Sequence, residues 1–403
     1  MPMGDKLTFL CMASYFKGVD FMKSVKAMGH YVLLLVPEKH RDDPWPREAI
    51  DEIFVLPSLQ KMPDVLYTIA WMMRGRKIDT LVALDDFDVE TAGLLRAHLR
   101  LPGMGETAAR AFRDKLTMRE LAREAGVRVP EYTRVTNYDE LRDFMARVPA
   151  PWVLKPRSEA SAMGIRKLHE SEQLWRALDQ LGDTQSYFVL EQFVPGDVFH
   201  VDSLVNDGVP VFAYPSVYAR PPMNVYHEGG VFGSRTLDRN SALAQGLLEI
   251  NKRTLKALGM GHGANHAEFI RGHADGELYF LECAARVGGA NIAEMVEHAS
   301  GVNLWAEWAR IEEAFITGRS YAAPASRDHA AGVLVCLARQ QWPDLSSYSD
   351  AEIVFRLQKE HHAGLIVSSP DANRVETLLN AYLERFAVDF LATAPPKNSI
   401  TEM

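Results

Sequence analysis

The sequence predicts a protein of mixed α/β and α+β class, and three observations lead to that prediction. The chain has 403 residues, more than one compact hydrophobic core usually contains, so two or three domains are expected. Over residues 7–101, short continuous apolar runs alternate with helical stretches, which is typical of a parallel sheet covered on both faces. Later segments pair strand-like runs around tight turns, which is typical of antiparallel sheets.

Composition and charge limit the partners that the protein can have. Hydrophobic residues make up 47% and charged residues 24% of the chain, which is ordinary for a folded globular protein. The formal net charge of -9 provides no basic field for a nucleic acid, and no apolar run approaches the roughly 20 residues that span a bilayer. Cys11, Cys283 and Cys336 lack the spacing of a metal-binding or redox pair. We therefore expect a cytoplasmic protein with no nucleic-acid or membrane partner.

Turns and helix stops place the elements after residue 101. Gly103, Gly105 and Ala108 form a G-x-G-x-x-A pattern, but a helix precedes it, so we interpret it as a turn and not as a dinucleotide-binding fingerprint. A helix over about residues 108–125 is expected to stop at Gly126. The later elements are expected in this order: a helix at 138–147 among three short strands, strands over 187–219, a helix at 241–258, a hairpin at 265–283, a helix at 302–316, and strands with a final helix at 374–386 after residue 330.

A charged residue interrupts one strand of the predicted hairpin. The stretch LYFLECAARVGGA begins as a buried strand, yet Glu282 lies inside the apolar run. Burying a carboxylate is costly unless another group compensates its charge. The turn at Asp275-Gly276 places a second strand, which carries Glu268, beside the first. A compensating group is therefore expected close to Glu282.

The relation between the two glutamates depends on the register of the hairpin. We expect a turn centred on Ala274, which places Glu282 opposite His266 and keeps Glu268 on the same face, about 7–8 Å away at the backbone. A shift by one residue would put the glutamates on opposite faces. In the favourable register the two carboxylates converge, and such a pair either shares a proton or binds a cation such as Mg²⁺. The alternative interpretation is two glutamates on a solvated sheet face.

The residues that follow Glu282 add a cation and a flexible backbone. Arg286 and the pair Gly288-Gly289 come directly after the strand. Beside a metal, an arginine and a glycine-rich turn could hold a transferring phosphoryl group or a developing oxyanion. The alternative interpretation is that the glycines only form a tight turn into the next helix.

Two lysines are candidates for binding phosphate. Lys155 ends an apolar strand and is followed by SEASAMG, a loop of small side chains that runs through Ser161 to Gly164. Backbone N–H groups of such a loop can approach phosphate oxygens, and serine hydroxyls add further donors. Lys115 lies on a helix, where the alternative is a solvated side chain. The P-loop pattern G-x-x-x-x-G-K-[ST] does not occur in the sequence.

The segment FVLEQFVPGD resembles a strand that ends in a linker. Glu191 would accept a hydrogen bond from the exocyclic amine of adenine there, and Phe193 or Val194 would contact the ring. The alternative interpretation is an ordinary hairpin with a charged tip.

Taken together, these motifs resemble the ATP-grasp superfamily. The matching stretches are RDKLTMRELAREAGVRVP, WVLKPRSEASAMGIRKL, FVLEQFVPGDVFHVDSLV and NHAEFIRGHADGELYFLECAARVGGANI, in that order. The resemblance implies a Rossmann-like pre-ATP-grasp domain at residues 1–112, a small ATP-grasp lobe at 113–190, a large lobe at 191–325 and a small C-terminal α+β portion at 326–403.

The resemblance also implies roles for individual residues. Glu268 and Glu282 would ligate Mg²⁺ or Mn²⁺, and Arg286 and Gly289 would stabilise a phosphoryl or tetrahedral intermediate. The residues implied to bind ATP are Lys115, Lys155, Ser161, Gly164, Glu191, Val194 and Asp197. The implied chemistry is formation of an acyl phosphate from a carboxylate and ATP, followed by attack of an amine and release of ADP and phosphate.

The chain departs from the family pattern at three positions. Ala284 stands where many members carry a metal-binding Asn, so a second cation would depend on the bridging glutamate and on phosphate oxygens. Val198 stands where a ribose-binding Glu is common, with Asp197 or Asp202 as substitutes. Ala160 stands in the phosphate loop where Gly is frequent.

Within the superfamily, the stretches LECAARVGGA and YHEGGVFGSR are most similar to the amino-acid ligases. This resemblance implies small-molecule carboxylate and amine substrates. It makes His227, Glu228 and Arg235 candidate contacts to substrate or γ-phosphate, with Ala290 helping to set the size of the substrate pocket. A surface loop without a role is the alternative for the first three. A bicarbonate-using, carboxylase-like enzyme and a non-catalytic ATP-binding protein remain open as functions, and an exposed face of the N-terminal domain is compatible with a homodimer.

Overall fold

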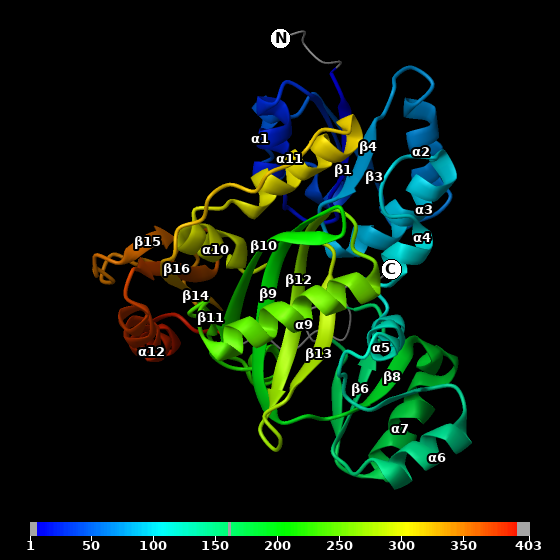
Figure 1. Ribbon diagram of the computed structural model, residues 1–403, viewed down its shortest axis with the longest axis vertical. Helices are drawn as coiled ribbons and strands as arrows, with labels where there is room; N and C mark the ends of the chain where they lie inside the picture. Colours follow the sequence, from blue (N-terminus) through cyan, green and yellow to red (C-terminus); the bar gives the residue numbers. More distant parts are fainter. Residues whose placement is uncertain (1–5, 160–162, 393–403) are drawn as a thin grey trace.

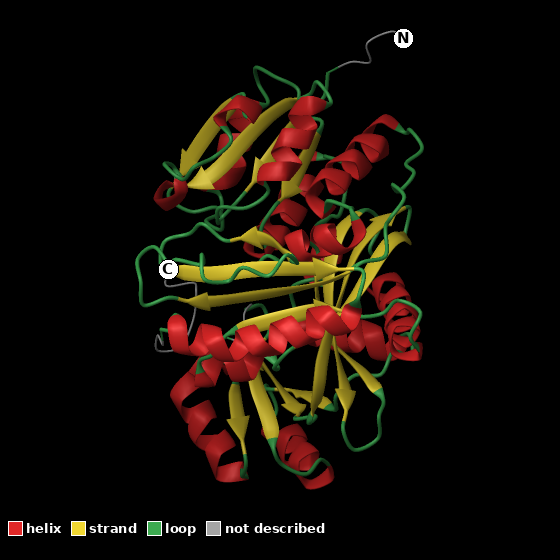
Figure 2. Cartoon of the chain, turned by 90° about the vertical axis from the view of Figure 1, so that its left-hand side faces the viewer, coloured by secondary structure: helices red, strands yellow, loops and turns green. Residues whose placement is uncertain are grey.

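The computed structural model describes residues 6–159 and 163–392, and these residues form three β-sheets (Figure 1; Figure 2). The first sheet has four parallel strands in the order β3-β2-β1-β4. Its strands are β1 (Thr8–Met12), β2 (Tyr31–Pro37), β3 (Glu52–Leu56) and β4 (Thr80–Ala83). The predicted Rossmann-like N-terminal domain is therefore confirmed.

Both faces of this parallel sheet are covered, which explains its continuous apolar runs. Side chains alternate along a strand, so Cys11 of β1 packs toward one face and Met12 toward the other. The covering helices are α1 (Val19–Ala27), α2 (Asp64–Met72), α3 (Val89–Leu99) and α11 (Leu304–Thr317). α11 belongs to the C-terminal half of the chain, yet it lies beside α1 (Figure 1), where Trp308 contacts Phe21 with ring centroids 5.2 Å apart. A distant segment thus closes one face of the N-terminal domain.

A second, antiparallel sheet with the order β5-β8-β6-β7 forms the small lobe. Its strands are β5 (Tyr132–Arg134), β6 (Trp152–Pro156), β7 (Arg166–Leu168) and β8 (Phe188–Gln192). The helices α6 (Tyr138–Arg147) and α7 (Ser171–Leu181) pack against this sheet around a core that includes Leu141, Leu154 and Leu174. The predicted helix at residues 138–147 is confirmed.

The single helix predicted over residues 108–125 is wrong, because the chain forms two helices there. α4 (Glu106–Arg110) ends early, and α5 (Lys115–Glu124) begins after Asp114. The Asp114 carboxylate accepts a hydrogen bond from a backbone N–H of the first turn at 3.0 Å, and such a cap fixes where a helix starts. The break makes Lys115 the first residue of α5 and leaves it only 7% exposed.

The third sheet has eight antiparallel strands in the order β13-β12-β9-β10-β11-β14-β16-β15. The strands are β9 (Gly196–Asn206), β10 (Val209–Tyr218), β11 (Phe232–Thr236), β12 (Gly263–Gly272), β13 (Leu278–Ala284), β14 (Ala330–Leu337), β15 (Ile353–Arg356) and β16 (His362–Ser369). The predicted division at residue 325 falls between α11 and β14, although β14, β15 and β16 continue the same sheet. The boundaries between the four predicted domains remain predictions.

Four further helices accompany the large sheet. They are α8 (Pro222–Glu228), α9 (Ala242–Leu258), α10 (Ile292–Ser300) and α12 (Ala372–Asp389). α9 runs across β9, β12 and β13 in Figure 1. On the part of the chain that the structure describes, no helix has the length and apolar character that crossing a bilayer requires.

The hairpin of β12 and β13 has a different register from the predicted one. Glu268 lies directly opposite Glu282, whereas the next pair toward the turn is Phe269 and Phe280. Leu281 is therefore an extra residue, a β-bulge, on β13. Nearer the turn the pairing differs from the predicted one by a single residue, which alone would put the glutamates on opposite faces. The bulge shifts β13 by one more residue and returns both glutamates to one face.

Gly196 begins β9 at a point where the neighbouring strand leaves no room for a side chain. A Cβ atom there would lie 2.2 Å from the carbonyl oxygen of Arg271 and 2.8 Å from Cγ1 of Ile270. We expect Gly196→Ala to lower the free energy of unfolding by about 1–3 kcal/mol, because the opposing backbone cannot yield without disturbing the strand pairing. Urea denaturation followed by circular dichroism measures this change.

Gly246 in α9 provides the matched control. The nearest atom to a Cβ at this position, Cδ1 of Leu278, is 3.6 Å away, which is an ordinary contact. Gly246→Ala should raise the free energy of unfolding by about 0.5–1 kcal/mol, because alanine favours the helix. Equal urea midpoints for the two variants would contradict the packing argument.

Candidate active site

A cavity of about 460 Å³ lies between the small lobe and the eight-stranded sheet. Its walls come from α5, β6 and β8 on one side and from β9, β10, β12 and β13 on the other. The sequence-predicted site residues that line it are Lys115, Lys155, Glu191, Val194, Glu268, Glu282, Arg286, Gly289 and Ala290. Folding therefore gathers residues from widely separated parts of the sequence around one space.

Asp197 and Arg235 do not line the cavity, and the alternation of side chains along a strand explains both placements. Asp197 points away from the cavity because its neighbour Val198 lines it, and the Asp197 carboxylate is exposed, 3.4 Å from His273. Arg235 lies on the face of β11 that is turned away from the cavity, where it forms an ion pair of 2.8 Å with Glu376 of α12. This placement speaks against Asp197 as a ribose ligand and against Arg235 as a substrate contact.

Other predicted residues fall on segments that are partly described. Ser161 lies outside the described residues. His227 and Glu228 end α8, and their side chains are likewise outside the described part of the structure. Gly164 lies between two residues that line the cavity and has a φ of 68°, a conformation that glycine adopts without strain. Asp202, the other predicted substitute for a ribose ligand, is fully buried between two histidines and lies outside the cavity wall.

Lys115 compensates the charge of Glu282. Nζ of Lys115 lies 3.0 Å from Oε2 of Glu282 and donates a hydrogen bond to the carbonyl oxygen of Glu159 at 2.6 Å. Burial by itself would raise the pKa of Glu282, but the charges of Lys115 and Lys155 outweigh burial and lower that pKa to about 2. The carboxylate is therefore ionised at neutral pH although it lies in an apolar strand.

Glu268 is held by a second set of partners. The hydroxyl of Tyr218 donates a hydrogen bond to Oε1 of Glu268 at 2.6 Å, and Nε2 of His266 lies 3.5 Å from the same oxygen. Tyr218 lines the cavity but was not predicted from the sequence, because a tyrosine at the end of an apolar strand carries the same signal as a core residue. Glu268 and Glu282 thus line the cavity from directly paired positions, each fixed by its own partner.

A buried network of charges holds Lys155 in place. Nζ of Lys155 lies 2.8 Å from Oε2 of Glu191, and Nε of Arg119 lies 3.0 Å from Oε1 of the same carboxylate. Burial lowers the pKa of Lys155 to about 8, although Glu191 opposes this shift. Two cations hold the Glu191 carboxylate, and its contact with adenine stays a prediction. Arg119 was missed from the sequence, although it lies four residues after Lys115 and therefore on the same helical face.

Arg286 lies in the turn between β13 and α10. Its NH1 donates a hydrogen bond to the carbonyl oxygen of Val287 at 3.0 Å, whereas its Nε is buried without a hydrogen-bond partner among the described residues. Burial disfavours the charge, but the carboxylates of Asp86, Asp85 and Glu282 outweigh it and raise the pKa of Arg286. The guanidinium is therefore charged, and Arg286 lines the cavity, where its positive charge favours an anionic group.

The donor set of the cavity fits a divalent cation with hard oxygen ligands. Mg²⁺ commonly takes one or two carboxylates from a protein and completes its shell with water and phosphate oxygens. Glu268 and Glu282 supply two such carboxylates, and Ala284, opposite His266 on the neighbouring strand, supplies no ligand. The cationic side chains of Lys115, Lys155 and Arg286 around the same cavity suit the phosphates that would complete the shell.

The chain is similar to known proteins in both sequence and fold. Residues 120–291 match the family model described as ATP-grasp domain. The L-arginine-specific L-amino acid ligase of Bacillus subtilis is 24% identical over 261 residues, which cover 63% of this chain and 62% of that protein. The alanine--anticapsin ligase of Bacillus subtilis is 23% identical over 253 residues, covering 56% of this chain and 52% of that protein. The aligned part thus spans less than two thirds of the length of either relative.

Solved structures extend the likeness to the whole fold. The L-amino acid ligase from Bacillus licheniformis superposes with a TM-score of 0.75 at 15% identity, covering 96% of this chain and 98% of that chain. The N5-carboxyaminoimidazole ribonucleotide synthetase from Thermus thermophilus superposes with a TM-score of 0.70 at 17% identity, covering 96% of this chain and 99% of that chain. At this level of identity the likeness concerns the fold, and it confirms the fold class predicted from the sequence.

The network around Glu191 predicts a large effect on stability. Glu191→Gln removes the negative charge that both Lys155 and Arg119 require, so two buried cations lose their counter-charge. We expect the free energy of unfolding to fall by about 3 kcal/mol or more. The exposed Glu172, which pairs with Arg176 at 3.2 Å, provides the control, and Glu172→Gln should change stability by about 0.5 kcal/mol at most. Similar urea midpoints for both variants would refute the structural importance of the network.

Proposed function

We propose that this chain, which carries an ATP-grasp domain over residues 120–291, is an ATP- and Mg²⁺-dependent ligase that joins a carboxylate to an amine. The observation that carries the proposal is the convergence around one cavity of two buried lysines, two cross-strand glutamates and Arg286. These are the groups that binding a metal–triphosphate and stabilising its transferred phosphoryl group require. ADP and phosphate are the expected products beside the amide.

Nucleotide and cation together would redistribute the charges of the cavity. Glu268 and Glu282 would hold Mg²⁺, or Mn²⁺ in its place, which would neutralise charge on the phosphate oxygens of ATP. Lys115, now paired with Glu282, would turn to the phosphates beside Lys155. Because each charged group exchanges one partner for another, no buried charge is left uncompensated. The adenine ring would lie against the apolar wall that includes Val194.

The proposed reaction has two steps. A carboxylate oxygen of the first substrate attacks the γ-phosphorus of ATP, so that an acyl phosphate forms and ADP leaves. The neutral amine of the second substrate then attacks the carbonyl carbon, phosphate leaves, and the nitrogen loses a proton as the amide forms. The charged Arg286 lines the cavity and would stabilise the negative charge that develops in both steps. Gly289 belongs to the same cavity wall.

Amino acids are the substrates that we propose, because one curated relative and one structural neighbour are named as L-amino acid ligases, and a second relative is named as an alanine--anticapsin ligase. His227 and Glu228 belong to α8, whose earlier residues line the cavity, and we propose them as substrate contacts. Ala290 lines the cavity with a φ of 52°, which a larger, β-branched side chain would adopt only with strain. We therefore propose that a short side chain at this position keeps the substrate end of the cavity open.

A phosphate-release assay over pairs of amino acids, followed by mass spectrometry, tests the function. We expect ADP, phosphate and a product whose mass equals that of the two amino acids less one water. Glu282→Gln should reduce turnover by about 100-fold or more, because one of two cation ligands loses its charge. AMP and pyrophosphate as products, or phosphate release that requires bicarbonate and not an amine, would contradict the proposal.

Glu277→Gln is the matched control for that variant. Glu277 adjoins the same strand of the hairpin, is about half exposed and lies 3.4 Å from Arg128 outside the cavity. Turnover of Glu277→Gln should equal that of the unmodified protein. An equal loss of turnover in Glu282→Gln and Glu277→Gln would contradict a specific role of Glu282, because any change of charge on the hairpin would then reduce activity.

The pKa of Lys155 predicts how nucleotide affinity depends on pH. Because this pKa is lowered to about 8, the ammonium group is charged below that pH and its attraction for phosphate is lost as the pH rises through it. We expect the affinity for a non-hydrolysable ATP analogue, measured by calorimetry, to fall about ten-fold between pH 7 and pH 9. Lys155→Arg, which keeps its charge over this range, should flatten the profile. If the affinity of Lys155→Arg fell as much as that of the unmodified chain, the pH dependence would come from a group other than Lys155.

A further inference from the structure

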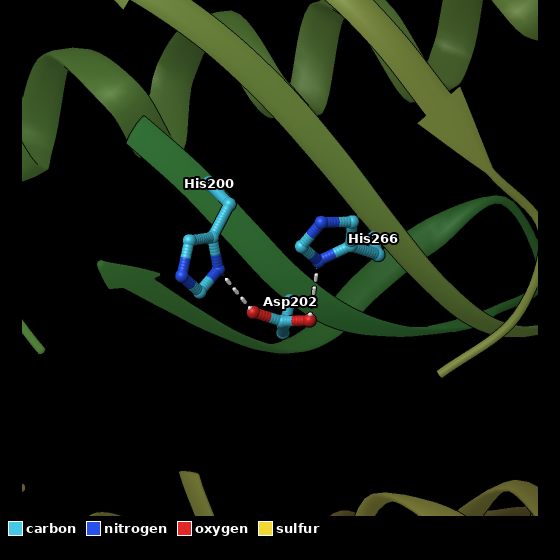
Figure 3. A group of neighbouring side chains, drawn as sticks. All are labelled: His200, Asp202 and His266. Atoms are coloured by element: carbon cyan, nitrogen blue, oxygen red, sulfur yellow. Dashed lines mark hydrogen bonds and ion pairs between the residues drawn. The ribbon is translucent and has the colours of Figure 1, made fainter. Parts of the chain in front are cut away.

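A chain of buried polar side chains lies next to the proposed cation ligands. Figure 3 shows His200 and His266 on either side of Asp202, with both imidazoles directed at its carboxylate. Nδ1 of His200 lies 2.6 Å from Oδ2 of Asp202, and Nδ1 of His266 lies 2.9 Å from Oδ1. His200 and Asp202 belong to one face of β9, and His266 faces Asp202 from the adjacent β12. Both oxygens of the carboxylate are therefore engaged by imidazoles.

The chain extends beyond these three residues at both ends. On one side, Nε2 of His200 lies 2.7 Å from Oγ of Ser234 on β11. On the other side, Nε2 of His266 lies 3.2 Å from the hydroxyl of Tyr218, which donates to Oε1 of Glu268 at 2.6 Å. One hydrogen-bonded path thus connects a buried serine of the sheet interior to a carboxylate at the cavity wall.

The direction of the hydrogen bonds follows from the acceptor at the centre. Burial would raise the pKa of Asp202, but the two histidines outweigh burial and hold that pKa far below its usual range. An ionised carboxylate can only accept, so both histidines must donate their Nδ1–H to it. This fixes the orientation of each ring and directs Nε2 of His266 toward Tyr218 and Glu268.

The backbone of Gly288 packs against Asp202 and His266. A Cβ atom at this position would lie 2.7 Å from Oδ1 of Asp202 and 3.1 Å from Nδ1 of His266. The backbone of the glycine turn therefore packs directly on the hydrogen bond between these two residues and excludes water from it. The absence of a side chain at Gly288 permits this contact, which the sequence did not predict.

The three residues resemble a metal site in composition, but their hydrogen bonds favour another role. His200, Asp202 and His266 place one ligand atom each within 4.8 Å of one another. A cation between them would need both Nδ1 atoms without their hydrogens and would displace the contacts that Asp202 already accepts. Their outward nitrogens contact a serine and a tyrosine instead.

We propose that His200 and Asp202 are positioning residues for the cation site: they fix His266, and through His266 and Tyr218 they fix the carboxylate of Glu268. The inference rests on the proposed function, because it assigns a purpose to the orientation of a proposed cation ligand. It accounts for the pairing of Glu268 with Glu282, whose mutual repulsion would otherwise turn the two carboxylates apart. Partners that orient a ligating group commonly change metal affinity 10–100-fold when removed.

Direct Mn²⁺ binding to the full chain tests the proposal. Electron paramagnetic resonance of free Mn²⁺, in the presence of a non-hydrolysable ATP analogue, gives the dissociation constant without turnover. We expect Asp202→Asn and His200→Ala to raise this constant about ten-fold and to raise the KM for Mg²⁺ more than they lower kcat. Affinity for the nucleotide measured without any divalent cation should stay unchanged. His200→Asn, whose amide can still donate to Asp202, should restore most of the Mn²⁺ affinity.

Ser203→Ala is the matched control for lost stability. Ser203 follows Asp202 on β9, faces the other side of the sheet and accepts a hydrogen bond from Asn251 at 2.9 Å. Its replacement removes a buried hydrogen bond from the same strand, and we expect Mn²⁺ affinity to stay unchanged. If Asp202→Asn does not fold, the Mn²⁺ dissociation constants of His200→Ala and His200→Asn test the proposal without it.

Three results would overturn the proposal. The first is a Mn²⁺ dissociation constant of His200→Ala equal to that of the unmodified chain. The second is an equal loss of Mn²⁺ affinity in Ser203→Ala. The third is Mn²⁺ binding that survives in Glu268→Gln but disappears in His200→Ala, which would make the histidine cluster itself the metal site. If the unmodified chain bound no Mn²⁺ with nucleotide, the proposed function would fail together with this inference.

Discussion

Two carboxylates on adjacent strands repel each other, and the other charged groups of the site are arranged around this repulsion. Glu268 and Glu282 occupy directly paired positions of the large sheet, and both line the same cavity. The structure meets this repulsion by giving each carboxylate its own partner. Lys115 comes from α5 to pair with Glu282, whereas Tyr218 from β10 donates to Glu268. The ion pair of Lys115 and Glu282 crosses the cavity from α5 to β13, so it joins the two sides of the cavity. The contact of Tyr218 with Glu268 lies within the eight-stranded sheet.

Local departures from regular structure serve the same arrangement. The bulge at Leu281 turns Glu282 to the face that carries Glu268. The break before α5, capped by Asp114, places Lys115 at the beginning of a helix where its ammonium group reaches Glu282. The bulge and the helix break each interrupt a regular hydrogen-bonding pattern, and each directs a charged side chain into the cavity. Such irregularities are common where function constrains a fold.

The sequence predicts the fold class and the lining of the cavity because both have local signals. Continuous apolar runs indicate a covered parallel sheet, and a charge such as Glu282 inside an apolar run marks a residue that needs a partner. The register of the hairpin has no such signal, since the bulge at Leu281 leaves the strand pattern almost unchanged. Asp197 and Arg235 were misplaced because neighbours on a strand face opposite ways, and one sequence does not show which way is inward.

We propose that Glu268 and Glu282 hold a cation that accompanies ATP and that Lys115 turns from Glu282 to the phosphates. A crystal structure of the chain with Mn²⁺ and a non-hydrolysable ATP analogue would show both, because manganese is located by its anomalous signal. We expect an anomalous peak between the two carboxylates and a Lys115 ammonium group in contact with phosphate oxygen. A nucleotide bound in the cavity with the ion pair of Lys115 and Glu282 intact, and manganese absent from the two carboxylates, would contradict this proposal.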